Sequence, residues 1–433
     1  MKLTVFQAGK GDCLLLTGRD GTNVLIDGGM RDAYQTHVAP ALGRLADEDK
    51  RLDLVYLSHI DRDHISGVLQ LLDDTLDWRV FDFQRGRGND RFPEPERPRP
   101  PNIANLWHNA FHEQVQENTG EIEDLLAARA AILAASNDRG LQELAPFDRE
   151  LATSISEGLE LARRAGPEQL GIPVNKQFDG RLALVRTGGK SIRLRGLTLT
   201  VIGPFREDLD ALRREWNEWL ATHRAQLATL QRQMERDAGR LGTDVTALNE
   251  PLELAAGELG DRSKVTVPNL ASLMLHAKEG RRTILLTGDG HALDILKGLE
   301  QTKKLDRDGL IHVDVLKVQH HGSEHNLDPA FVQRVSADAY VFCGNGEHEN
   351  PDPRVVQAVI DSRLGPEESR NPHPKAGNDF ALHFNSSSRA APGKPEREHM
   401  RGIEQLVKAA ARKSRGKLSS SFLDDSSFTL DVG

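Results

Sequence analysis

Short apolar runs alternate with polar stretches along the chain, and several of the runs end in histidine or aspartate. The first of these runs, Leu52–Leu57, is followed directly by the polar segment 58–64. An apolar run of this length predicts a buried strand. Between residues 65 and 72, apolar side chains recur at three- and four-residue steps, which predicts that a helix begins at the end of the polar segment.

The polar segment has the residue types and spacing of a metal site. His59 and Asp61 alternate along extended backbone, so both side chains can reach one ion. Asp63 and His64 lie where the chain turns into the helix, and they can reach a second ion. A polar turn with a helix cap is the structural alternative, but such a turn does not require this density of metal-binding side chains.

Two later strands end in residues of the same kinds. Thr283–Leu286 is followed by Thr-Gly-Asp289, and Val313–Val318 is followed by Gln-His320-His321-Gly-Ser. A Gly-Asp step alone usually marks a turn. Adjacent histidines at the end of a strand are more specific, and the glycine after them lets the backbone come close to whatever the imidazoles bind. Three such strands predict a metal centre at one rim of a sheet.

These segments resemble the metallo-β-lactamase fold superfamily and, within it, the ComEC-like branch related to a DNA-uptake channel protein. The superfamily pattern His-x-His-x-Asp-His is present as His59-x-Asp61-x-Asp63-His64, the form found in that branch. Residues 5–15 look like the branch's Val-Gly-Gln-Gly-Asp signature, with Lys10 where the branch has glutamine. Further matching segments follow in the family's order, namely residues 24–29, 269–273, 287–289 and 316–323.

The resemblance implies an α/β (α+β four-layer) fold, the αββα sandwich, and a set of ligands. His59 and Asp61 would hold one ion, and Asp63 and His64 the other. Asp289 would bridge the two ions, and His320 or His321 would complete the set. Asp27 would accept hydrogen bonds that orient the ligands.

Two positions depart from the superfamily pattern. The superfamily's middle histidine has no counterpart here, and Asn269 lies nearest to it in order, which places this amide beside the ligands. The late His-Pro-x-Pro element reads Asn-Pro-Asp-Pro at residues 350–353, with His348 two residues earlier as a substitute ligand.

The ligand set bears on the metal and on the reaction. An aspartate at position 61 makes the set richer in oxygen, which moves the preference from Zn²⁺ towards Mn²⁺ or Mg²⁺. We expect two divalent ions, Mn²⁺ or Zn²⁺, with Mg²⁺ as a further candidate. The expected reaction is metal-assisted hydrolysis of a phosphodiester, with Asp63 as the catalytic residue that also orients the attacking water. Lys10 and Ser323 are candidates for contact with the phosphate oxygens.

Three functional interpretations stay open. The first is a phosphodiesterase, most specifically a nuclease, acting as the cutting component of a larger system on nucleic acid or a nucleotide. The second is a hydrolase of a small ester, lactone or cyclic nucleotide. The third is a weakly active scaffold that recruits a partner. The intact set of ligand-type residues favours the first two over the third.

The segments that match the family divide the chain. Residues 1–83, 181–205 and 264–390 are expected to form the catalytic domain, and 391–433 a basic helix and a short strand. Residues 84–180 begin as a loop rich in proline and arginine, and residues 103–165 have helical spacing. Residues 206–263 are expected to be a long helical insertion. Residues 182–185 are expected to form a strand, and the serines at 419–421 are expected to be mobile. The apolar stripe within 206–236 predicts intramolecular packing, a homodimer seam or a docking face for a protein partner.

Composition narrows the class of protein. The net charge of −9 argues against binding nucleic acid over the whole surface, although basic residues gather at 401–417 and in the loop 84–101. Each stretch fits either a phosphate contact or a solvated surface. Two cysteines, Cys13 and Cys343, predict buried free thiols. With no apolar run long enough to span a bilayer, we expect a cytoplasmic protein that does not enter a membrane.

Overall fold

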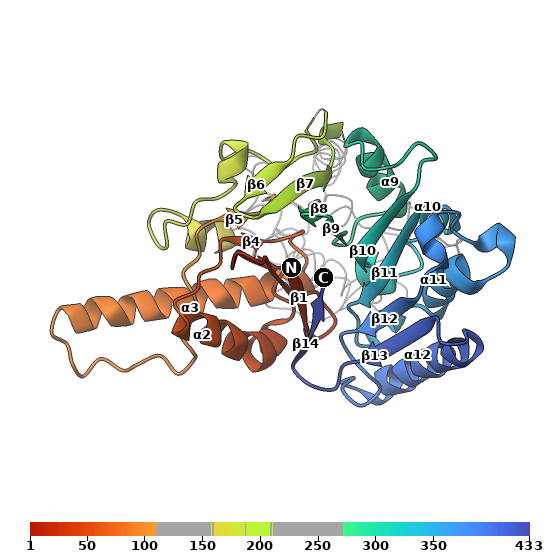
Figure 1. Ribbon diagram of the computed structural model, residues 1–433. Helices are drawn as coiled ribbons and strands as arrows, with labels where there is room; N and C mark the ends of the chain where they lie inside the picture. Colours follow the sequence, from red (N-terminus) through yellow and green to blue (C-terminus); the bar gives the residue numbers. More distant parts are fainter. Residues whose placement is uncertain (110–156, 158–159, 187, 208–209, 211–271) are drawn as a thin grey trace, which may run out of the picture.

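Two β-sheets lie face to face, and helices cover the outer face of each sheet (Figure 1). The computed structural model describes residues 1–109, 157, 160–186, 188–207, 210 and 272–433. Three apolar clusters separate the layers: one lies between the sheets, and one lies under each set of helices. The predicted αββα sandwich is confirmed.

The first sheet belongs to the N-terminal half except for one strand from the C-terminus. Its order within the described residues is β14-β1-β2-β3-β4-β5. The strands are β1 (Lys2–Phe6), β2 (Leu14–Thr17), β3 (Asn23–Ile26), β4 (Leu54–Tyr56), β5 (Leu106–Trp107) and β14 (Ser427–Asp431). Strands β3, β4 and β5 are parallel, so their carboxyl ends meet at one rim.

The second sheet contains the strands that follow β5 in the chain except β14, and its order within the described residues is β13-β12-β11-β10-β9-β8-β7-β6. Its strands are β6 (Ile192–Leu194), β7 (Leu197–Gly203), β8 (Met274–Glu279), β9 (Arg282–Leu286), β10 (Ile311–Lys317), β11 (Val335–Phe342), β12 (Phe380–Phe384) and β13 (Leu418–Phe422). Strands β9 to β13 are parallel, which directs the ends of β9 and β10 to a common rim.

The helices are divided between the two outer faces. On the first sheet lie α1 (Arg31–Ala33), the π-helical turn η1 (Tyr34–Val38), α2 (Ala39–Asp47) and α3 (Arg62–Gly86). On the second sheet lie α9 (Ala292–Gln301), α10 (Pro329–Arg334), α11 (Pro353–Leu364) and α12 (Lys394–Lys413). The far half of α3 extends beyond the sheet (Figure 1), and Arg97 and Arg99 of the following loop pair with its Asp74 and Asp82.

The sequence predicted most of these elements, and three differ. Residues 103–165 were expected to be helical, and residues 160–165 are, but Leu106–Trp107 form β5, a strand too short to show an alternating pattern. Residues 110–156 of this range lie outside the described part of the chain. Residues 182–185 were expected to form a strand, but they form none, because the Ala183 backbone bonds to the Asn109 side chain instead of a neighbouring strand. The serines at 419–421, expected to be mobile, form β13 by pairing with β12.

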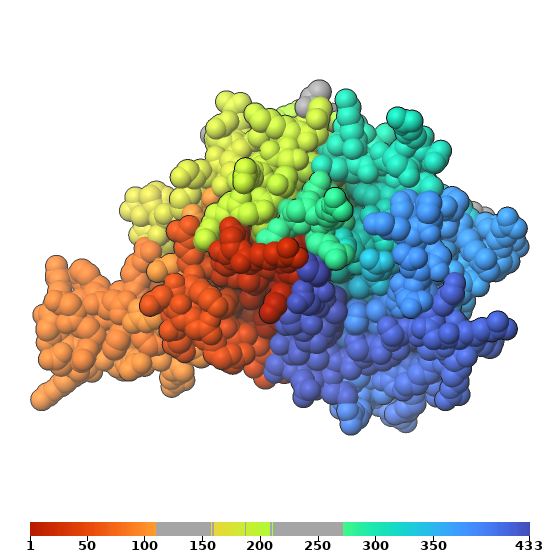
Figure 2. Space-filling view, in the orientation of Figure 1, coloured from red at the N-terminus to blue at the C-terminus, as the bar shows by residue number. Residues whose placement is uncertain are grey.

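The C-terminal segment joins both halves of the molecule. Strand β13 extends the second sheet beside β12, and β14 extends the first sheet beside β1. In the space-filling view, this part of the chain lies across the junction between the two halves (Figure 2). The predicted insertion 206–263 lies outside the described residues except for residues 206, 207 and 210, and so does most of its stripe 206–236.

Cys13 and Cys343 are both buried and free, as predicted. Among the helices that the structure describes, none has the length and apolar character that crossing a bilayer requires.

Candidate metal centre

The predicted site residues come together where the two sheets meet at one rim. Asp27 follows β3 and His59 follows β4, while Asp289 follows β9 and the pair His320-His321 follows β10. Because these four strands deliver their carboxyl ends to the same side, residues from both halves of the chain face one another. Asp63 and His64 join this group from the first turn of α3, the helix that covers the first sheet.

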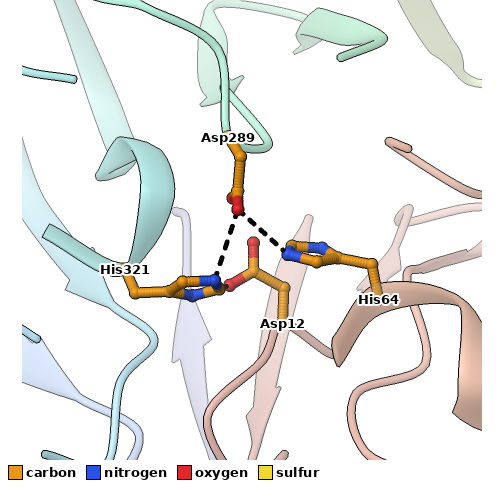
Figure 3. A group of neighbouring side chains, drawn as sticks. All are labelled: Asp12, His64, Asp289 and His321. Atoms are coloured by element: carbon orange, nitrogen blue, oxygen red, sulfur yellow. Dashed lines mark ion pairs between the residues drawn. The ribbon is translucent and has the colours of Figure 1, made fainter. Parts of the chain in front are cut away.

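Asp289 lies at the middle of this group. Its Oδ2 atom is 3.3 Å from His64 Nε2 and from His321 Nε2, and the dashed lines in Figure 3 mark both contacts. The same oxygen is 3.6 Å from His59 Nε2 and 3.7 Å from His320 Nε2. One carboxylate oxygen therefore faces the Nε2 atoms of four imidazoles, as a carboxylate shared between two ions would.

Asp61 and Asp63 lie on different sides of this centre. Asp61 Oδ2 is 3.5 Å from His59 Nε2. Asp63 Oδ2 is 3.0 Å from His321 Nε2, and its Oδ1 is 3.9 Å from His64 Nε2. The donor atoms thus form two groups that share Asp289.

The outer nitrogens of the imidazoles are held by groups from the surrounding loops. Asp27 Oδ2 is 3.0 Å from His64 Nδ1, and Asp27 also accepts hydrogen bonds from the Ser58 N–H and hydroxyl. His320 Nδ1 lies 2.6 Å from Asn326 Oδ1, and His321 Nδ1 lies 2.7 Å from the Cys343 carbonyl oxygen. With Nδ1 engaged in this way, each Nε2 keeps the lone pair that a metal ligand needs.

Two observations show that these residues fit metal ions. The Nε2 atoms of His59, His64 and His321 are buried and have no hydrogen-bond partner among the described residues, although buried polar atoms are normally paired. The site also holds more negative than positive charge. Its charged groups are five carboxylates and one ammonium, namely Asp12, Asp27, Asp61, Asp63, Asp289 and Lys317. When the imidazoles are neutral, these groups have a net charge of −4, which two divalent cations would balance.

The electrostatics of the metal-free site keep Asp63 and Asp289 ionised and His64 and His321 protonated. Burial opposes ionisation of Asp63 and Asp289, but the charges of His64 and His321 outweigh it, so the pKa of each carboxyl lies below its ordinary value. Burial likewise opposes protonation of His64 and His321, but Asp289 outweighs it and raises their pKa well above 6.5. His320 differs, because burial dominates there and lowers its pKa.

The comparison with protein families agrees with this geometry. A family model described as the metallo-beta-lactamase superfamily matches residues 7–75, which include Asp27 and the whole segment His59–His64. The chain has the metallo-β-lactamase fold. No curated protein shows a significant match to the chain.

Solved structures share little beyond a distant likeness. One is Zn²⁺-bound PqqB from Methylobacterium extorquens, at 10% identity and a TM-score of 0.33, with 100% of both chains covered. Another is a mutant of the β-hydroxylase CmlA, at 12% identity and a TM-score of 0.33. The alignment covers 99% of this chain and 53% of CmlA, so the chain spans about half of that protein. Likeness at this level carries no argument about function.

The metallo-β-lactamase fold brings two further residues to the site that the sequence interpretation gave no role. Asp12, from the connection between β1 and β2, groups with His64, Asp289 and His321, their donor atoms all lying within 4.8 Å of one another (Figure 3). Lys317, near the end of β10, pairs with Asp12. The available signal was a lysine in the otherwise apolar end of a predicted strand, together with the Gly-Asp step of the N-terminal signature.

The remaining predicted residues lie around the centre or outside the described part. Lys10 precedes Gly11, whose backbone packs against Asp63 so closely that a Cβ on Gly11 would not fit. The Nζ atom of Lys10 is 3.4 Å from His348 Nε2. Ser323 is buried, and its hydroxyl accepts a hydrogen bond from His325 N. Asn269 lies outside the described residues.

Metal binding is expected to release protons, with an affinity that rises with pH. At pH 7 the raised pKa values keep His64 and His321 protonated in the metal-free protein, and an ion must displace those protons. Calorimetric titration with Mn²⁺ in two buffers of different ionisation enthalpy should give different heats. Equal heats in both buffers would contradict the expectation. His276→Gln is the control, because burial holds the pKa of that imidazole at about 4 and it should have no proton to lose.

The same shifts give the metal-free fold a definite pH dependence. Between pH 6.5 and the raised pKa values, the folded protein binds more protons than the unfolded chain. The contribution of His64 and His321 to the free energy of unfolding is therefore fully present below pH 6.5 and is lost as the pH rises through the raised pKa values.

Proposed function

We propose that the protein is a metal-dependent phosphodiesterase, a nuclease of the ComEC-like kind, with a dinuclear centre that activates water. One observation carries the proposal: a single oxygen of Asp289 faces four imidazole Nε2 atoms, with Asp61 and Asp63 on its two sides. Two groups of donors that share one carboxylate are what a pair of ions requires for hydrolysis.

The residues divide between the two ions in the proposed centre. His59, Asp61 and Asp289 would hold one ion, and Asp63, His64, His321 and Asp289 the other. His320 Nε2 lies 3.7 Å from Asp289 Oδ2, and its side chain is 26% exposed. When bound, Mn²⁺ or Zn²⁺, or alternatively Mg²⁺, would supply Lewis acidity and lower the pKa of the attacking water. The three carboxylates favour Mn²⁺ or Mg²⁺.

The chain's own residues orient the reaction. Asp63 stays ionised, so its carboxylate accepts a hydrogen bond from the attacking water and fixes the direction of its lone pair. The water oxygen forms a new bond to phosphorus while the bond from phosphorus to the leaving alcohol oxygen breaks, and the proton that the water loses ends on that leaving oxygen. Asp27 keeps His64 in the orientation and tautomer that this geometry needs.

Basic side chains on the same rim support an anionic substrate. Arg62 directly precedes Asp63 in the sequence, and Lys10 directly precedes Gly11, whose backbone packs against Asp63. A hollow of about 510 Å³ lies at the end of β7, and its lining includes Arg181, Arg186 and Arg206. Strand β7 is two strands away from β9 in the same sheet, and both pair antiparallel with β8, so they run in the same direction. In a protein of net charge −9, this local positive charge would attract a phosphate backbone.

A comparison of substrates tests the proposal. The metal-stripped protein would be reloaded with Mn²⁺, Zn²⁺ or Mg²⁺ and given plasmid, linear and single-stranded DNA, RNA, a chromogenic phosphodiester and a lactone. We expect cleavage of a nucleic acid and of the phosphodiester, fastest with Mn²⁺, and its loss in Asp63→Ala. Protein that holds two ions yet cleaves no phosphodiester in any metal would contradict the proposal.

A hydrolase of a small ester, lactone or cyclic nucleotide is the second candidate. A hollow of about 430 Å³ at the end of β5 favours it, since its lining is largely apolar and includes Ile172, Val174 and Leu182. Hydrolysis of the lactone alone in the same comparison would select this candidate. A homodimer or a protein partner bound through residues 206–236 remains a proposal beside either activity, and recruitment by a weakly active scaffold remains the third candidate.

A further inference from the structure

A buried ion pair lies directly behind the candidate ligands. Lys317 and Asp12 are each 1% exposed, and the Lys317 ammonium contacts Asp12 Oδ2. The same ammonium donates a hydrogen bond to the Gly288 carbonyl oxygen at 3.0 Å and lies 3.6 Å from Asp289 Oδ1. Lys317 therefore lies within ion-pair distance of the oxygen of Asp289 that does not face the imidazoles.

Asp12 makes the matching contact on the other side. Its Oδ1 is 3.2 Å from His321 Nδ1, which also lies 2.7 Å from the Cys343 carbonyl oxygen. Since a carbonyl oxygen can only accept, the hydrogen is on Nδ1 and the lone pair of the neutral ring is on Nε2. Asp12 thus favours the tautomer and ring orientation in which His321 Nε2 faces Asp63 and Asp289.

The cost of this pair indicates a role beyond stability. Burying an ammonium and a carboxylate costs several kcal/mol per ion, and replacing such a pair with apolar residues is often neutral or stabilising. The two groups are nevertheless buried together in direct contact, and the ammonium also donates a hydrogen bond to the Gly288 carbonyl oxygen.

We infer that Asp12 and Lys317 are a positioning pair for the dinuclear centre, and that Asp12 is not a ligand. Lys317 engages Asp289 Oδ1 so that Oδ2 is presented to the ions, and Asp12 engages His321 Nδ1 so that Nε2 is presented. Asp12 Oδ2 is paired with Lys317, and Asp12 Oδ1 faces His321 at Nδ1, 3.2 Å away, on the side of the ring opposite to the Nε2 atom that faces Asp63 and Asp289. The inference rests on the proposed dinuclear centre, but its test does not depend on hydrolysis.

The test uses Asp12→Asn, Lys317→Met and the double variant in the full chain, with Mn²⁺ as the probe. Each single variant leaves one buried charge without its partner, so we expect lower thermal stability of the metal-free protein. The double variant removes both charges and should recover stability. It should still bind Mn²⁺ with affinity about 10- to 100-fold lower than the unchanged protein, because Asp289 and His321 lose their orientation.

The electron paramagnetic resonance spectrum of Mn²⁺ gives a readout that a purely structural pair would not change. Two ions bridged by Asp289 give an exchange-coupled signal, and we expect the double variant to show more of the uncoupled signal at equal Mn²⁺. If the double variant binds two ions with unchanged affinity and coupling, the pair is only a packing feature and the inference is wrong. If Asp12→Asn loses one ion while Lys317→Met keeps both with unchanged affinity, Asp12 is a ligand and the inference is also wrong.

The neighbouring pair Arg282–Asp314 is the matched control. It joins β9 to β10, the strand that carries Lys317, but its arginine is 47% exposed and lies at the end of β9 opposite to Asp289. Arg282→Met with Asp314→Asn should leave Mn²⁺ affinity and coupling unchanged. Failure of the proposed phosphodiesterase activity would appear separately, as unchanged protein that binds two coupled ions but hydrolyses no phosphodiester.

Discussion

Asp289→Asn should abolish hydrolysis and leave the centre unable to hold two ions. The change keeps the volume of the side chain but removes the charge that four imidazole Nε2 atoms face at 3.3–3.7 Å. An amide is a weak ligand and cannot bridge two cations as a carboxylate does. We expect phosphodiester hydrolysis to fall by roughly 1,000-fold or more, since the residue serves both ions.

Two measurements together check this expectation. Metal content after dialysis against Mn²⁺ should fall from two ions to one or fewer per chain, and the rate with the chromogenic phosphodiester should fall with it. Asp308→Asn is the control, because this substitution makes the same chemical change at an exposed aspartate in the loop before β10, away from the rim. An Asp289→Asn protein that keeps two ions and a near-normal rate would remove the basis of the proposed mechanism.

Gly67→Ala is expected to destabilise the fold and to impair the centre at the same time. Gly67 lies in the second turn of α3, where the helix backbone packs directly on Gly28 at the end of β3. A Cβ at position 67 would overlap the Gly28 carbonyl oxygen, and one at position 28 would overlap the Val68 nitrogen. The helix must therefore move away from the sheet, at a cost of about 3 kcal/mol in the free energy of unfolding.

The same displacement reaches the metal ligands. The Gly28 N–H donates to the His64 carbonyl oxygen at 2.8 Å, and Asp27 Oδ2 lies 3.0 Å from His64 Nδ1. A shift of about 1 Å in a reacting group can cost about 100-fold in rate, so we expect a loss of that order. Chemical denaturation and the hydrolysis rate measure the two effects.

Gly86→Ala provides the comparison within the same helix. Its Cβ would meet nothing within 4 Å, so alanine should be neutral or slightly stabilising there. If Gly67→Ala unfolds at the same denaturant concentration as Gly86→Ala and keeps full activity, the close packing of α3 on β3 does not position the centre.

The ligand-type residues of the centre were recognisable before the fold was known, because their signal is local. Strand ends that carry His59, Asp289 and the His320-His321 pair stand out against apolar runs, and parallel strands bring such ends to one rim. By contrast, the sequence did not predict that the segments of the shortest strand, β5, and of the serine-rich β13 would be strands at all. A two-residue strand has no period, and the polar residues of β13 are in a strand only because β12 offers them hydrogen bonds.

The sequence by itself determined which chemical groups the rim would carry and that two halves of a sandwich would hold them. Tertiary structure alone decided their arrangement: Asp289 in the middle, His321 rather than His320 beside Asp63, and Asp12 paired with Lys317 behind them. The physical reason is distance along the chain. Spacing within a strand or helix fixes which neighbours share a face, whereas contacts between the N-terminal and C-terminal halves depend on how the two sheets pack.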